Sequence, residues 1–408
     1  MAVKREAVYK EAVNLSEARK MVRKIRADLS LKREDEKIPI TDAIGRKLAG
    51  DIIARRAGPA RNFALMDGYA VRVEDEHPLR RLVGPVRTGD RAENIPPLEK
   101  GSACPISTGA FLPEGANAVL RLEDSRTEGN RLTGPALSRW MNVAREGSHY
   151  RKGTKLIRVG STVRPQEIAL LTEIGEKTVT VLKKLRVGVF SSGEEFARGI
   201  IPDTNSPMII STLKNWGCEP VWLGVAKDKS KSIESLLKKG LKTCDAILSS
   251  GSISKGQNCY LPSIISRLGT IIFKQVSIKP GKLLMVAMVN KKPVFCLPGK
   301  PTGAFTALNL VIQAFFKPDM RYSVTRKKLA QTVLVNNSKY TYVVFLTFKG
   351  KKAYPLGYRL SGLKILESGL PYLPGIISST PRAAVADGFM LTEKDLLQGE
   401  TVEVNLLT

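Results

Sequence analysis

The stretch between about residues 185 and 317 alternates strictly between strand-like and helix-like runs, which limits it to a layered α/β fold. The expected strands are residues 186–190, 220–223 and 246–248, and the expected helices start near residue 203 and cover residues 230–241. Because parallel strands need a long crossover connection, the order predicts a doubly wound, three-layer α/β sheet domain. Ligands of open α/β sheets bind at the carboxyl ends of the strands, so we expect the site in the loops there.

Three loops of this stretch are rich in glycine, serine, proline and lysine. In the first, residues 249–256, small side chains let the backbone approach a phosphate; its candidate residues are Ser250, Gly251, Ser252, Ser254 and Gly256. The second and third loops pair a rigid turn with a cation; their candidates are Lys279, Lys282, Pro298, Gly299, Lys300 and Pro301. Together the three loops predict a site for an anionic ligand.

The net charge supports an acidic ligand. Lys and Arg number 65 against 38 Asp and Glu, which gives +27 and favours phosphates, oxyanions or nucleic acid as partners. We find no helix-turn-helix, zinc finger, RNP-like aromatic strand or basic helix in the sequence, and the positive charge is spread over the whole chain. A basic nucleic-acid-binding protein is therefore the third of three functional hypotheses, and a lysine-rich solvated surface is the alternative explanation of the charge.

Cysteine usage and hydropathy predict the compartment. The five cysteines are odd in number and widely spaced, which favours a reducing environment over a disulfide framework. The longest apolar run, residues 304–316, is interrupted by Asn309 and Gln313, and no apolar leader follows Met1. We expect a cytoplasmic protein with no membrane partner.

The pattern outside the alternating stretch indicates further domains. Apolar residues at helical spacing after Ser16 predict a helix capped by that serine, which we expect to pack on a helical stretch at residues 41–49. The expected domains are a helical or mixed N-terminal linking domain (1–50 and 146–183), an inserted β-rich domain (51–145), the α/β domain (184–318) and a C-terminal β-barrel (319–408).

The order of short motifs along the chain resembles the MoeA-type molybdopterin molybdenumtransferases. The motifs are residues 66–70 (Met-Asp-Gly-Tyr-Ala), 108–109, 165–171, 191–195, 203–205, 279–282 and 297–301. Each is weak alone, but together they follow the family's order over nearly the whole chain. The resemblance implies a homodimer that inserts molybdate into adenylylated molybdopterin and releases AMP, with a site between the α/β domain of one subunit and the Asp-Gly-Tyr segment of the other.

The resemblance also implies roles for individual residues. Asp67, Glu195 and Asp228 match the family's functional acids, and Glu195 and Asp228 would hold Mg²⁺ on the diphosphate. Thr108 and the loop residues named above would bind the pterin nucleotide, with Lys300 standing where the family usually has an asparagine. The alternatives are a hairpin turn for Asp67, a helix cap or surface position for Glu195 and Asp228, and solvated surface for the lysines.

The sequence departs from the family where two acids are expected. Cys259 and His149 stand at those places, and Ser252 replaces a glycine. This motivates the second hypothesis, a catalytically impaired paralogue that binds molybdopterin or a related nucleotide without turnover. A further alternative is that Cys259 and Cys296 bind a soft metal or the molybdenum product, although a lone cysteine is more often a small buried apolar residue.

Overall fold

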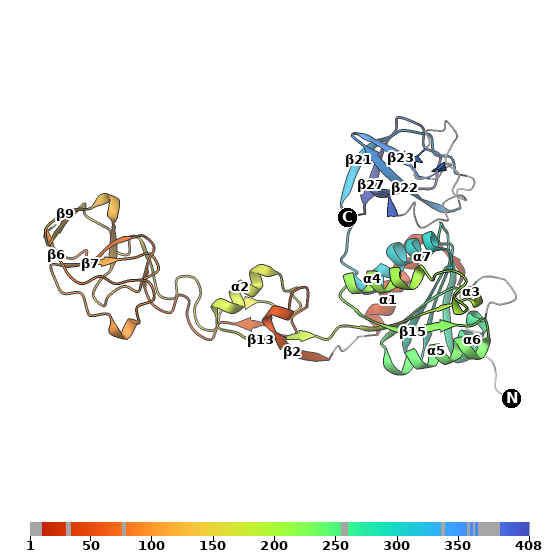
Figure 1. The fold of residues 1–408 in the computed structure, drawn as a ribbon, viewed down its shortest axis with the longest axis horizontal. Coiled ribbons are helices and arrows are strands. Elements are labelled where there is room, and N and C mark those ends of the chain that lie inside the picture. The colour runs from red at the N-terminus through yellow and green to blue at the C-terminus, as the bar shows by residue number, and fades with distance from the viewer. Residues whose placement is uncertain are drawn as a thin grey trace. The chain divides into compact units, whose positions relative to one another are not determined.

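The computed structural model describes residues 10–29, 34–75, 79–253, 260–335, 339–356, 360–361, 364–365 and 384–407 (Figure 1). The chain divides into two compact units. One comprises Met1–Arg33 and Lys184–Thr408, and the other comprises Glu34–Lys183. Among the helices in the described ranges, none combines the length and the apolar character needed to cross a bilayer.

A seven-stranded sheet forms the centre of the first unit. Its order is β1 (Lys10–Val13), β17 (Gly269–Val276), β19 (Leu283–Val289), β20 (Lys292–Leu297), β16 (Ala246–Ser250), β14 (Arg186–Ser192) and β15 (Glu219–Ala226). All pairings are parallel except those of β19 with its two neighbours. The three expected strands are therefore present as the parallel β15, β14 and β16. Strand β20 extends this parallel core, and one reversed strand follows it in the sheet.

Helices cover both faces of this sheet, as Figure 1 shows. One face carries α1 (Leu15–Asp28), α4 (Asn205–Asn215) and the continuous run α7 (Pro301–Ala307), η4 (Leu308–Ile312) and α8 (Gln313–Phe316); the other carries α5 (Ser230–Thr243) and α6 (Leu261–Leu268). A separate apolar core lies under each helical layer. The doubly wound, three-layer prediction is confirmed.

Helix α1 differs from its sequence-based prediction in its cap and in its packing partner. Asn14, not Ser16, is the cap, and its side chain accepts a hydrogen bond of 2.8 Å from the Glu17 N–H. The helix packs on η4 and α8, and β1 joins the sheet beside β17. Residues 10–28 thus belong to the α/β domain and not to the linking domain, and residues 41–49 contain only the end of the short 3₁₀ helix η1 (Ile40–Asp42).

The C-terminal strands close into the expected barrel. They are β21 (Val324–Leu329), β22 (Thr341–Lys349), β23 (Lys352–Pro355), β26 (Gly388–Thr392) and β27 (Thr401–Leu406). The ring closes because β26 pairs with both β22 and β27. The short strand β18 (Ile278–Lys279) pairs in parallel with β22, and β24 (Leu360–Ser361) pairs with β25 (Lys364–Ile365). The pairing of β18 with β22 joins the second predicted loop to the barrel.

The second unit contains a β-rich part and a mixed part with separate cores. Its larger sheet has the order β8 (Ala118–Arg121), β5 (Gly68–Val71), β7 (Ser102–Ile106), β6 (Arg80–Leu82), β10 (Arg131–Thr133) and β9 (Arg126–Glu128). Three strand pairs accompany it: β11 (Val143–Ala144) with β4 (Phe63–Ala64), β12 (Lys155–Ile157) with β3 (Ile52–Ile53), and β13 (Thr178–Leu182) with β2 (Asp35–Pro39). The last pair packs with α2 (Pro165–Glu173) in one core, while the larger sheet has its own.

Candidate functional site

The ends of β14, β16 and β20 bring two of the three predicted loops together. Ser191 is in register with Ser250, and Ser250 with Leu297, so the chain leaves all three strands at one edge of the sheet. The Ser192 hydroxyl lies within hydrogen-bond distance of the Ser250 carbonyl oxygen, at 3.3 Å, and of the Ser252 hydroxyl, at 2.8 Å. Buried Ser192 thus holds the start of the serine and glycine loop in place.

Glycine is required at the centre of this loop. Gly251 has φ of +93°, and a Cβ atom there would lie 2.5 Å from the Ser192 carbonyl oxygen. Gly299 of the third loop approaches the same point, since a Cβ added to it would lie 3.8 Å from the Gly251 Cα. The two loops therefore present bare backbone to each other and to the space above the strand ends, as close approach to a phosphate requires.

Asn205, which was not predicted as a site residue, is hydrogen-bonded to both the loop after β16 and the loop after β20. Its side-chain nitrogen donates to the Ser250 hydroxyl at 2.7 Å and to the Gly299 carbonyl at 2.8 Å. Asp203 fixes the start of α4 by accepting from the Asn205 and Ser206 N–H groups, both at 3.1 Å. The sequence signal was the Asp-Thr-Asn motif itself, which alone indicates only a helix start.

The second loop lies beside the third. A Cβ on Gly281 would lie 3.3 Å from the Gly303 carbonyl oxygen, and one on Gly303 would lie 3.3 Å from the Pro298 ring. The turn carrying Lys279 and Lys282 therefore rests against the start of α7, where Pro301 is the first residue and exposed Lys300 precedes it.

Tyr340, at the entry to β22, lies between the two lysines of the second loop. The Lys279 Nζ is 4.3 Å from the centre of its ring and the Lys282 Nζ is 5.5 Å away. A hydrogen bond from Lys282, aided by the charge of both lysines, lowers the pKa of Tyr340. Such cation–π contacts orient the ammonium groups of both lysines beside the third loop, where an anion can reach them.

The two expected metal-binding acids lie at the neighbouring strand ends. The Asp228 carboxylate, after β15, accepts a hydrogen bond of 3.4 Å from the Glu194 N–H. A Cβ added to Gly193 would lie 2.9 Å from each carboxylate oxygen of Glu195, which places that side chain over the β14–α3 turn (α3, Glu194–Ala197). Both acids are half-buried, and within the described part of the chain the Glu195 carboxylate has no hydrogen-bond or ion-pair partner.

Glu195 and Asp228 are carboxylates, the class of oxygen donor that magnesium binds. Magnesium prefers hard oxygen ligands and is commonly held by one or two carboxylates together with substrate phosphates. Over the described ranges, no group of three or more His, Cys, Asp or Glu side chains is arranged as a closed metal site. Glu195 and Asp228 could thus supply charge and oxygen ligands but not a complete protein cage.

Cys296 is one of the two candidate soft-metal ligands. It is fully buried in the apolar core beneath α5 and α6, and this burial raises the pKa of its thiol to about 12. Among the described residues Cys296 belongs to no group of three or more metal-ligating side chains, so the structure favours the small buried apolar role that the sequence also allowed. Ser254, Gly256 and Cys259 lie outside the described residues, so the predictions for them stay predictions.

Asp67 and Thr108 meet in the second unit. One oxygen of the Asp67 carboxylate accepts from the Thr108 N–H at 2.7 Å and from its hydroxyl at 3.0 Å, and these bonds lower the pKa of Asp67. Asp67 is exposed, next to Leu65 and Met66, which are each 46% exposed. The hairpin alternative is wrong, because β4 and β5 pair with other strands and not with each other.

The second replaced position, His149, also lies in the second unit. Its backbone N–H donates to the Gly58 carbonyl at 2.9 Å, so the main chain there is part of an ordered turn. Nothing in the described contacts gives the imidazole a ligand role.

Family models and known proteins agree with this architecture. Residues 13–175 match the MoeA N-terminal region (domain I and II), and residues 188–318 match the family described as "Probable molybdopterin binding domain". A molybdopterin molybdenumtransferase from Nostoc is 30% identical over 70% of this chain and 69% of its own length; one from Bacillus subtilis is 29% identical over 74% and 75%.

A solved structure extends the match to the barrel. The molybdopterin biosynthesis MoeA protein from Pyrococcus horikosii is 28% identical, with a TM-score of 0.78, over 98% of this chain and all of that one. Strand order, site loops and sequence relatives therefore lead to one conclusion: the chain belongs to the MoeA-type molybdopterin molybdenumtransferases, a family of molybdenum cofactor biosynthesis enzymes.

Proposed function

We propose that this protein inserts molybdate into adenylylated molybdopterin, with cleavage of the diphosphate and release of AMP. The observation that carries the proposal is the meeting of Gly251 and Gly299 at the strand ends, with Lys279 and Lys282 on the adjoining turn. Bare backbone and oriented cations are the groups that a pterin diphosphate and an oxyanion need.

The loops divide the binding between them. Ser250, Gly251 and Ser252 would approach the phosphates, and Pro298 and Gly299 would form the opposite wall with Lys300 and Pro301. The loop cations Lys279, Lys282 and Lys300 would balance the charge of the diphosphate and of molybdate. Because Lys279 and Lys282 are held beforehand by Tyr340, these two side chains need little reorganisation on binding.

Glu195 and Asp228 would hold magnesium, which when bound neutralises charge on the diphosphate. Asp228 is oriented for this by the Glu194 N–H, and Glu195 has no competing partner in the described chain. We expect Glu195→Gln and Asp228→Asn each to raise the magnesium concentration needed for half-maximal AMP release. Glu219→Gln, on the same sheet but paired with Arg186, serves as the matched control.

We further propose a cytoplasmic homodimer in which Asp67 and Thr108 of one copy complete the site of the other. The support is the exposure of Leu65 and Met66 beside Asp67, since large apolar side chains clustered at a surface favour a partner. Sedimentation velocity tests the oligomeric state. A monomer at micromolar concentration would remove this part of the proposal and leave the reaction itself untouched.

The decisive experiment mixes the purified protein with adenylylated molybdopterin, magnesium and molybdate and measures AMP. Release that depends on all three components and is reduced by Lys279→Ala supports the proposal. Tight ligand binding in calorimetry without AMP would instead identify a binding paralogue, and recovery of turnover by Cys259→Asp would identify the lost acid as its cause. Salt-dependent binding to random duplex DNA, with no AMP release, would favour the nucleic-acid hypothesis.

A further inference from the structure

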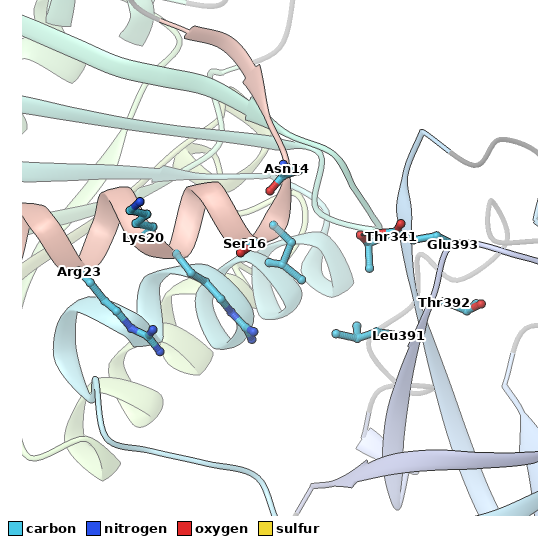
Figure 2. A pocket seen from close by; sticks show the side chains of 10 residues that line it. Asn14, Ser16, Lys20, Arg23, Thr341, Leu391, Thr392 and Glu393 are labelled. Atoms are coloured by element: carbon cyan, nitrogen blue, oxygen red, sulfur yellow. Dashed lines mark hydrogen bonds between the residues drawn. The ribbon is translucent and has the colours of Figure 1, made fainter.

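A groove separate from the predicted loops lies between α1 and strand β26 of the barrel (Figure 2). Its volume is about 950 Å³, which is within the range of small-molecule sites in proteins. Helix α1 contributes Arg19, Lys20 and Arg23, and the barrel side contributes Thr341, Leu391 and Glu393. None of the residues assigned above to the molybdopterin site lines it.

The charges in this groove are not balanced by the protein. Three cations face one carboxylate, and Glu393 already accepts a hydrogen bond of 2.6 Å from the Thr341 hydroxyl. Across the described residues, no ion pair joins Arg19, Lys20 or Arg23 to an acid; Glu17, in the first turn of α1, pairs with Lys10 instead. Figure 2 shows Lys20 and Arg23 on the helix, across the gap from Leu391 and Thr392.

Arg19 is held in position. Its Nε donates to the Leu310 carbonyl at 2.5 Å, and the side chain is half-buried. This burial lowers the pKa of Arg19, and the positive charges of Arg23 and Arg321 lower it further. A fixed guanidinium with cations as neighbours gains more from a bound anion than a freely moving surface arginine would.

We propose that the groove binds the phosphate groups of a polyphosphorylated small molecule, with Arg19, Lys20 and Arg23 as the contacting side chains. Arg19 and Arg23 are one helical turn apart on the same face, so their two guanidinium groups can donate hydrogen bonds to neighbouring phosphates. Lys20 adds a third positive charge. The barrel wall opposite α1 favours a small molecule over a nucleic-acid strand. This site is independent of the reaction proposed above.

Calorimetry with two probes, ATP and inorganic tripolyphosphate, tests the site on the full chain. The variant K20E/R23E reverses two exposed cations of the groove. Its matched control, K239E/K242E, makes the same charge change at exposed positions of α5. A third variant, K279A/K282A, removes the cations of the molybdopterin loops and so separates the two sites.

We expect K20E/R23E to weaken the binding of both probes by at least about tenfold, because charge-assisted bonds to phosphate are lost. The control and K279A/K282A should retain a binding event of the wild-type affinity. Equal affinity for both probes means that the phosphates alone are recognised, and tighter ATP binding adds a nucleoside contact; both support the site. Absence of binding to the wild type, or binding lost only in K279A/K282A, overturns it.

Discussion

Replacing Asn205 with alanine should damage catalysis far more than stability. The change deletes two short hydrogen bonds, to the Ser250 hydroxyl and the Gly299 carbonyl, each worth about 1 kcal/mol net, and a weak 3.5 Å bond to the Pro298 carbonyl. It also removes the Asn205 Oδ1, a buried atom with no partner in the described structure, and so relieves a desolvation cost of about the same size as one bond. The change in hydrogen bonding should therefore lower the free energy of unfolding by only about 1 kcal/mol.

Catalysis depends on a different consequence of the same change. Asn205 bridges the loop after β16 and the loop after β20. Without it, the loops keep the 3.3 Å bond from the Ser250 hydroxyl to the Pro298 carbonyl and the 3.2 Å bond from the Gly251 N–H to the Leu297 carbonyl. A displacement of about 1 Å between binding loops can cost about a hundredfold in rate. We expect kcat/KM for AMP release to fall by about 10- to 100-fold.

Asn309 offers a matched control for this experiment. It is also a buried asparagine of the first unit, and its side-chain nitrogen donates to one described residue, the Phe305 carbonyl at 3.0 Å, within its own helical run. Urea denaturation and the AMP assay would be applied to both alanine variants. If Asn205→Ala lowered kcat/KM no more than Asn309→Ala does, the reasoning that Asn205 sets the loop geometry would be refuted.

Three further changes test other parts of the site. Gly251→Ala should destabilise the first unit by at least about 2 kcal/mol in urea denaturation, because the new Cβ meets a carbonyl at 2.5 Å with φ at +93°; an unchanged midpoint would contradict this. Tyr340→Leu should raise the KM for adenylylated molybdopterin about threefold by freeing Lys279, whereas Tyr340→Phe, which keeps the ring, should change it less. Thr108→Val should raise the pKa of Asp67 part of the way toward about 3.9, since the larger backbone bond remains, and carboxyl NMR titration would detect an unchanged value. Because the folded-state pKa of Asp67 is the lower one, its contribution to stability is present above about pH 4 and is lost as the pH falls through the folded value.

The position of the site, in loops at the edge of the sheet, could be predicted from sequence because short stretches of the chain determine it. An apolar strand followed by glycine and serine indicates a ligand loop at a sheet edge, and the structure shows Gly251 in that place with a backbone conformation that other residues avoid. The alternation of strands and helices likewise determined the layers. One reversed strand, β19, was not foreseen. The two-residue turn that joins it to β20, Asn290 and Lys291, has positive φ at both residues (50° and 61°), and lysine is not a residue that signals such a hairpin turn.

The features that could not be predicted depend on distant contacts. Asn14 and Ser16 are equally good caps by residue type; in the structure Asn14 is the cap, and Leu15, the first residue of the helix, is buried in the core. The prediction that α1 packs on residues 41–49 was wrong. The pairing of β1 with β17 places the helix beside α8, and this pairing joins residues that are far apart in the sequence. No motif around Tyr340 in the sequence indicates a role in the site. Its contact with the two lysines follows from the pairing of β18 with β22.

The shape of the loops at the strand ends depends on the main chain and on neutral side chains. The replacement of two expected acids therefore leaves that shape in place. The contact of Gly251 with Gly299, the bonds of Asn205 and the turn at Gly281 are set by main-chain geometry and by neutral groups, none of which involves residue 149 or residue 259. On the proposed function, each replacement removes one negative charge, at Cys259 in the loop after β16 and at His149 in the second unit. A site with less negative charge binds anions at least as well but attracts a divalent cation less strongly. The consequence of the replacements should therefore be found in the metal requirement of the reaction, and not in the affinity for the pterin phosphate.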